Sequence, residues 1–209
     1  MQGLAETLLV ATNVLEPMNI VDQRDSSAAG DLIGRDKFTT NYVTALPPKG
    51  MVERLLSKLQ QQVESNDETQ EIIDELARYH QKRSVDGVDG LEAKLKAAGK
   101  GSCYLDAIEK KEMFVKLLER WSLYLSAQQI FVHILAKAEI EFNNVVYLQI
   151  PRKTEAEINA LVIDRIVGPI VEECGYEVIG MSHNVVHGMV YWLAEQCFIR
   201  WHHSAQDST

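Results

Sequence analysis

The sequence predicts a mainly α-helical fold: a compact helical domain with a small N-terminal β-hairpin or strand element. Over residues 48–203, apolar residues recur at the three- and four-residue spacing of a helix face. Residues 26–47 differ, because small and turn-forming residues lead there into β-branched and aromatic ones. The 209 residues are enough for one ordinary domain, or for one domain with an appendage.

The chain divides into four segments. Residues 1–25 are predicted to form a short helical segment that Pro17 ends or deflects. Residues 26–47 form a glycine-rich β element of one or two strands around a tight turn, in which Gly30 and Gly34 supply backbone freedom. Residues 48–203 form the helical domain, and residues 204–209 form a tail.

Three helices are predicted in the first half of the helical domain. Asn66 marks the end of the first helix, and Gly99 and Gly101 mark the end of the third. Their apolar faces comprise, in order, Met51, Leu55, Leu56, Leu59 and Val63; then Ile72, Ile73, Leu76 and Tyr79; then Leu91 and Leu95.

Residues 102–142 contain apolar positions at helical spacing without any proline or glycine. They predict either one long helix or two helices joined closely. The brief apolar run over residues 145–150 fits either a strand or a buried connection.

Two further helices are predicted before the C-terminus. Thr154 and Glu157 have the order of a capping box and begin the first of them. Pro169 should kink that helix, and Gly175 should end it. Ser182 is a suitable cap for a final helix that we expect to continue through Trp201.

Charge and composition exclude several classes of protein. Lys and Arg total 21 against 30 for Asp and Glu, a net charge of −9, so we expect no direct nucleic-acid binding. No apolar run approaches the roughly 18 residues of a membrane span, and the start lacks a secretion signal. We therefore expect a cytoplasmic protein without a membrane partner. The three cysteines are widely spaced, which disfavours disulfides and zinc fingers.

The sequence offers one metal-site hypothesis. His183 and His187 lie four residues apart on a predicted helix and could share a zinc ion. A zincin has glutamate directly after the first histidine, whereas this chain has Asn184 there. A small metal-dependent hydrolase using these two histidines is therefore the alternative. The leading expectation is a protein that is not an enzyme and that holds no metal or other cofactor.

Other chemically interesting residues have simpler interpretations. The acidic residues on predicted helices are more typical of solvated faces than of acid–base catalysis. Cys103 is predicted near a helix N-terminus, but the sequence places no histidine beside it. The acidic residues considered are Asp106, Glu109, Glu172 and Glu173.

The string from Gly188 to Trp201 is unusually aromatic, and Arg200 lies in it between Ile199 and Trp201. Aromatic and arginine side chains are frequent anchors at protein interfaces. The alternative is a terminal helix that is buried within the domain. We predict an interaction surface here, formed by Gly188, Met189, Tyr191, Trp192, Arg200 and Trp201.

Several strings resemble one protein family. They are Ser126-Ala-Gln-Gln-Ile-Phe131, Ile163-Asp-Arg-Ile-Val-Gly-Pro-Ile170, Gly188-Met-Val-Tyr-Trp-Leu193 and Cys197-Phe-Ile-Arg-Trp201. Their order resembles the C-terminal domain of effectors in bacterial ABC three-component conflict systems, to which Lamassu-type antiphage systems are related. Upstream, Ala29-Gly-Asp-Leu-Ile-Gly-Arg-Asp-Lys37 is similar to a glycine-rich element that often precedes such domains. The chain departs from the family pattern at Ala194-Glu195-Gln196 and at Phe198, which stands where the family has histidine.

The resemblance implies a non-catalytic assembly or adaptor domain in antiviral defence. Such a domain self-associates and docks an effector to an ABC/SMC-type ATPase complex that also contains a small middle component. The residues ahead of the glycine element are too few for a toxic domain, so we expect a free-standing adaptor or an effector whose killing domain is encoded separately or lost. In the glycine element, the predicted interaction residues are Gly30, Asp31, Gly34, Arg35, Asp36 and Lys37.

Overall fold

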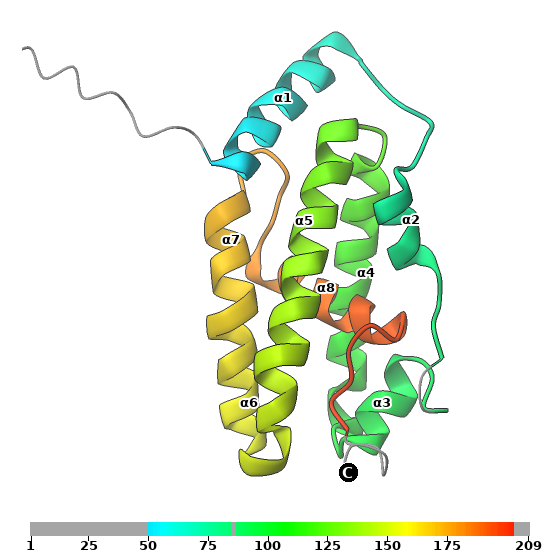
Figure 1. The fold of residues 1–209 in the computed structure, drawn as a ribbon, viewed down its shortest axis with the longest axis vertical. Helices are drawn as coiled ribbons and strands as arrows, with labels where there is room; N and C mark the ends of the chain where they lie inside the picture. The colour runs from blue at the N-terminus through cyan, green and yellow to red at the C-terminus, as the bar shows by residue number, and fades with distance from the viewer. Residues whose placement is uncertain (1–49, 85–86, 203–209) are drawn as a thin grey trace, which may run out of the picture. The chain divides into compact units, whose positions relative to one another are not determined.

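Figure 1 shows a computed structural model of the chain, which describes residues 50–84 and 87–202. The described residues are mainly helical and contain no strand, in agreement with the predicted helical domain. The predicted helical segment 1–25, the β element 26–47 and the tail 204–209 lie outside the described residues. Within the described residues, no helix is both long and apolar enough to cross a membrane.

Two antiparallel helices, α4 (Tyr104–Trp121) and α5 (Leu125–Glu141), lie at the centre of the domain (Figure 1). Residues 102–142 therefore form two closely joined helices, the second of the two alternatives. No proline or glycine is needed for the turn, because the Ser122 hydroxyl donates to the Leu118 carbonyl oxygen at 2.6 Å. Phe114 of α4 and Phe131 of α5 are both fully buried and meet edge to face.

Helix α5 passes through two irregular helical turns, η2 (Phe142–Val146) and η3 (Tyr147–Arg152). The strand interpretation of residues 145–150 is therefore wrong. The segment is a helical connection, and of its residues only Val146 is buried, so the alternative of a buried connection is right only in part. The predicted capping box then begins α6 (Glu155–Val162): the Thr154 hydroxyl accepts from the Glu157 N–H, and the Glu157 carboxylate accepts from the Thr154 N–H.

Helix α6 continues through the π-helical turn η4 (Ile163–Val167) into α7 (Gly168–Cys174). The departure from α-helical geometry directly precedes Pro169, where the sequence predicts a kink. Gly175 ends α7 as predicted, with a φ of 66° that favours glycine. The α6–α7 unit runs alongside α5 in Figure 1.

Helix α8 (His183–Glu195) crosses behind α5 in Figure 1 and packs closely against α4. Ser182 caps it as predicted, since its hydroxyl accepts from the Val185 N–H at 3.3 Å. The expected continuation through Trp201 is wrong, because α8 ends at Glu195 and Cys197 adopts a φ of 65°. The C-terminal segment, residues 196–202, instead folds back over the domain because distant side chains bind its carbonyl groups, as described below.

Three shorter elements cover the central helices: α1 (Met51–Ser65), α2 (Asp74–His80) and α3 (Leu91–Ala97). All three lie where helices are predicted, but α2 begins at Asp74, so the predicted face residues Ile72 and Ile73 precede it. Asn66 ends α1 in the left-handed conformation. A buried side chain attaches the link between α1 and α2 to the core. Gln128 of α5 accepts from the Ile73 N–H and donates to the Glu71 carbonyl oxygen.

Candidate docking surface

The structure places most of the predicted interaction residues of the C-terminal string inside the domain. Trp192 is 4% exposed and lies against Phe114, with ring centroids 5.6 Å apart. Trp201 is 5% exposed and meets both Phe142 and Tyr191. Burial raises the pKa of Tyr191 to about 12. These aromatic side chains therefore hold α8 and the C-terminal segment against the core.

Gly188 and Met189 are also buried, and Gly188 lies at the crossing of α8 with α4. The residues of the glycine element, Gly30, Asp31, Gly34, Arg35, Asp36 and Lys37, lie outside the described residues. Of the predicted interaction residues that the structure describes, only Arg200 has a partly exposed side chain.

Arg200 is held at the surface by Tyr147 of η3. Its Nε donates to the Tyr147 hydroxyl at 3.1 Å, and its guanidinium carbon lies 5.1 Å from the centre of the Tyr147 ring. Its neighbours Ile199 and Trp201 are buried. Buried neighbours on both sides and an aromatic platform together fix the position of this partly exposed arginine.

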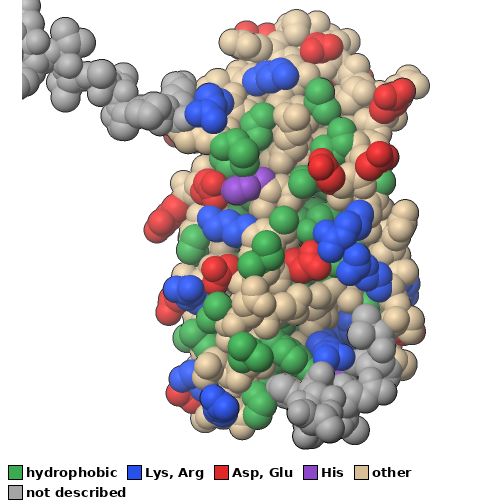
Figure 2. Space-filling view, viewed as in Figure 1, with side chains coloured by type: hydrophobic (Ala, Val, Ile, Leu, Met, Phe, Trp, Pro, Cys, Tyr) green, Lys and Arg blue, Asp and Glu red, His purple; other side chains and the backbone are tan. Residues whose placement is uncertain are grey.

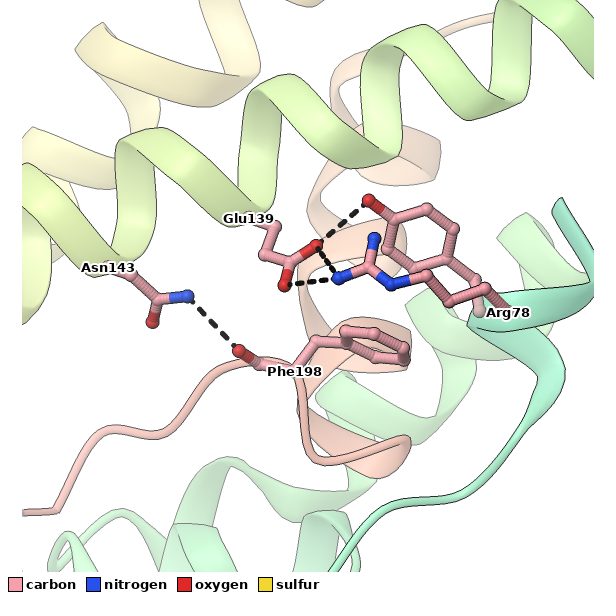
Figure 3. A network of polar contacts seen from close by, with 5 residues as sticks. Arg78, Glu139, Asn143 and Phe198 are labelled. Carbon is pink, nitrogen blue, oxygen red and sulfur yellow. Dashed lines mark hydrogen bonds and ion pairs between the residues drawn. The ribbon is translucent and has the colours of Figure 1, made fainter. Parts of the chain in front are cut away.

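A polar network fixes the middle of the C-terminal segment (Figure 3). Asn143 donates from Nδ2 to the Phe198 carbonyl oxygen at 3.2 Å. Close by, the Glu139 carboxylate accepts from Arg78 Nη2 and from the Tyr79 hydroxyl. Burial and, second to it, the hydrogen bond to Glu139 raise the pKa of Tyr79 to about 12.

Phe198 lies among aromatic and cationic groups. Its ring centroid is 4.7 Å from that of Tyr79, and the guanidinium carbons of Arg83 and Arg78 lie 4.2 and 5.3 Å from it. An uncharged aromatic ring suits this position, because arginine is attracted to an aromatic face. Phe198 therefore makes a packing contact that attaches α2 to the C-terminal segment.

Helices α3 and α8 cap each other. Lys94 of α3 is 2% exposed, and its Nζ donates to the carbonyl oxygens of Ala194 and Ile199 at 2.9 and 3.0 Å. In return, the Glu195 carboxylate at the end of α8 accepts from the N–H of Leu91, the first residue of α3, at 2.8 Å. The positive Lys94 side chain thus complements the partial negative charge at the C-terminal end of α8. The negative Glu195 carboxylate complements the partial positive charge at the N-terminal end of α3.

The metal-site hypothesis gains no support from the geometry. His183 is exposed, whereas His187 is partly buried and stacks on Tyr191 with centroids 5.0 Å apart. Burial lowers the pKa of His187, so its imidazole is neutral at neutral pH. In the part of the chain that the structure describes, no three histidine, cysteine or carboxylate side chains gather as metal ligands.

Two of the four acidic candidates form ion pairs at the surface. Asp106 pairs with Lys110, and Glu173 accepts from both His133 and Lys137. Glu109 and Glu172 are exposed. Cys103 is the N-cap residue of α4, as the sequence suggests.

Sequence reasoning missed Lys94, Asn143, Tyr147 and Glu195 as neighbours of Arg200 and the C-terminal segment. Their side chains have no local signature, since each acts on residues 53 to 105 positions away. From the sequence alone, Lys94 cannot be distinguished from an ordinary solvent-exposed helix lysine. Only the tertiary fold shows that it is buried.

Comparison with family models matches residues 90–201 to CTD9, the C-terminal domain 9 of the ABC-three component (ABC-3C) systems. The match spans α3 to the C-terminal segment and includes Lys94, Glu195 and Arg200. It confirms the resemblance stated from the sequence strings. Searches of curated proteins and of solved structures found no match.

Proposed function

Because the chain belongs to the CTD9 family of ABC-three component systems, we propose that it is a non-catalytic assembly domain of a conflict system. In this proposal the chain docks an effector to an ABC/SMC-type ATPase complex and its small middle component. The family match over residues 90–201 carries the proposal. Members of this family are components of multi-protein systems, so the chain needs a surface that its partners recognise.

We place that docking surface around Arg200 and Tyr147. The aromatic side chains of the string are buried, whereas Arg200 is partly exposed and is held in position by its bond to Tyr147. Arginine is enriched among the residues that dominate binding energies, and a preorganised side chain loses less entropy on binding. Away from this point, Figure 2 shows acidic and basic side chains interspersed over the face in view, without a large area of one sign.

We expect Arg200→Ala to weaken co-purification of the ATPase or the middle component while the domain stays folded. The side chain is partly exposed, so its loss should change the free energy of unfolding by only about 0.5–1 kcal/mol. The measurement pairs thermal melting with quantitative co-purification. Arg120→Ala is the matched control, because Arg120 is an exposed arginine in the last turn of α4.

Two outcomes would contradict this assignment. If Arg200→Ala lowers the melting temperature by much more than Arg120→Ala, Arg200 serves the fold. If both variants retain the partners equally, docking uses another surface.

The proposal also includes self-association through the glycine-rich element. An isolated two-stranded hairpin is marginal in water, so strands over residues 26–47 would need a partner, and a second copy can supply one. By light scattering, we expect the full chain to have the mass of at least a dimer. We expect a variant that begins at Pro48 to have the mass of a monomer. An unchanged subunit number on removal of residues 1–47 would place self-association elsewhere or rule it out.

A further inference from the structure

A pocket of about 280 Å³ is lined by residues of α3, α4, α6 and α8. It lies within the region that matches the family model. Arg200 and Tyr147 do not line it, so it is separate from the proposed docking surface. What the pocket can bind depends on which of its polar groups already have partners.

The charged side chains among the described lining residues form two ion pairs. Lys110 Nζ lies 2.7 Å from Asp106 Oδ2, and Lys100 Nζ lies 3.4 Å from Glu155 Oε1. Lys100 also donates to the side-chain oxygen of Asn159 at 3.0 Å. A charged ligand would compete with one member of an existing pair, which is costly, whereas an uncharged ligand leaves both pairs intact.

Tyr191 and His187 of α8 also line the pocket, and neither side chain has a hydrogen-bond partner in the part of the chain that the structure describes. Tyr191 is only 9% exposed, and its hydroxyl nevertheless bonds to none of the described residues. A buried hydroxyl normally has a partner, because leaving it without one costs free energy. The pocket is the space in which a ligand can supply that partner.

The two side chains present their polar atoms together. They lie four residues apart on α8 and therefore on one face, and their rings stack with centroids 5.0 Å apart and planes 15° apart. Burial lowers the pKa of His187 and raises that of Tyr191, so both groups are uncharged at neutral pH. A neutral imidazole has one donor and one acceptor, and a phenol can act as either.

From this arrangement we propose that the pocket binds a primary carboxamide. Such a group is uncharged and has an acceptor oxygen and a donor nitrogen on the same carbon, so it can bond to both rings without disturbing either ion pair. The apolar side chains of Leu95, Val162 and Trp201 suit the carbon chain that bears it. Two sources supply this chemistry: a small free molecule, or a glutamine or asparagine side chain of a docking partner. The partner as a source rests on the proposed function, whereas the existence of the site does not.

The site is tested by NMR titration of the ¹³C-labelled full chain with butyramide. We expect saturable shifts of the ring C–H signals of His187 and Tyr191. The ring of His183 is the internal control, because this histidine is exposed at the start of the same helix. Butyrate and butylammonium have a similar carbon chain but carry a charge, and they should bind at least about tenfold more weakly at constant ionic strength. Shifts that do not saturate, that are as large at His183, or that give equal affinities for the three compounds would overturn the proposal.

The variant Tyr191→Phe removes only the hydroxyl. This group has no partner to lose among the described residues, so the melting temperature should stay that of the unaltered chain, while butyramide binding should weaken about tenfold. Tyr79→Phe is the matched control with the opposite pattern. Its hydroxyl donates to Glu139 at 2.8 Å, so this variant should melt at a lower temperature and bind butyramide normally. Unchanged butyramide affinity in Tyr191→Phe would exclude this site.

Co-purification with Tyr191→Phe decides the source of the carboxamide. A lower recovery of the ATPase or middle component than with the unaltered chain assigns the site to a side chain of that partner. Equal recovery assigns it to a small free molecule. A saturable butyramide site in a chain that captures no ATPase component would leave the site in place and reject the proposed function, so the two failures are distinguishable.

Discussion

Replacing Gly188 with alanine is expected to lower the free energy of unfolding by about 3 kcal/mol, enough to unfold a marginally stable domain. A Cβ atom at this position would lie 1.9 Å from the Lys110 carbonyl oxygen and 2.4 Å from its carbonyl carbon. Both are backbone atoms of α4, so no side-chain rotation can relieve the overlap, and the two helices would have to separate. The higher helix propensity of alanine, about 1 kcal/mol, offsets only part of this cost.

Urea denaturation of Gly188→Ala beside Gly101→Ala measures this effect. A Cβ atom at Gly101 would lie 3.6 Å from a flexible Lys96 carbon, an ordinary contact, so that variant should differ from the unaltered chain by only about 0.5 kcal/mol. If Gly188→Ala is as stable as the control, α8 and α4 do not approach as closely as the structure shows.

Replacing Gln128 with methionine is expected to cost about 3 kcal/mol, although the two side chains are similar in size. Gln128 is fully buried and serves three backbone groups. Its Oε1 accepts from the Ile73 N–H at 2.9 Å, and its Nε2 donates to the carbonyl oxygens of Glu71 and Ser122 at 2.8 and 2.7 Å. Methionine fills the space but leaves these groups without partners in the interior.

The neighbouring glutamine supplies the control. Gln129 is exposed, so Gln129→Met should leave the melting temperature almost unchanged. The Gln128 variant should also expose the link between α1 and α2 to limited proteolysis near Ile73. Equal melting temperatures for the two variants would show that the three hydrogen bonds contribute little.

The parts of the fold that the sequence predicts are those with local causes. The helix start at Thr154 and the helix ends at Asn66 and Gly175 each depend on residues within one turn, and all three are confirmed. The end of α8 could not be predicted in this way. Apolar residues continue at helical spacing up to Trp201, but the carbonyl groups that would extend the helix are bound by Lys94, 100 residues away from Ala194.

The docking surface also depends on contacts between residues distant in the sequence, so the sequence alone could not locate it. An aromatic string with one arginine is equally typical of a core and of an interface, because both bury aromatic side chains. The fold separates the two within one string: Trp192 and Trp201 are buried in the core, and Arg200 is partly exposed and bonded to Tyr147. The neighbouring Lys94 has no sequence signal, since its burial depends on contacts with the far end of the chain.

The central claim is that this domain docks on an ABC/SMC-type ATPase complex. It is tested most directly by affinity purification of the tagged full chain from its native host, with mass spectrometry and the Arg200→Ala and Arg120→Ala variants in parallel. We predict that the ATPase component of the same system is enriched with the unaltered chain and with Arg120→Ala, and is depleted with Arg200→Ala. A folded chain that enriches no ATPase component would contradict the claim.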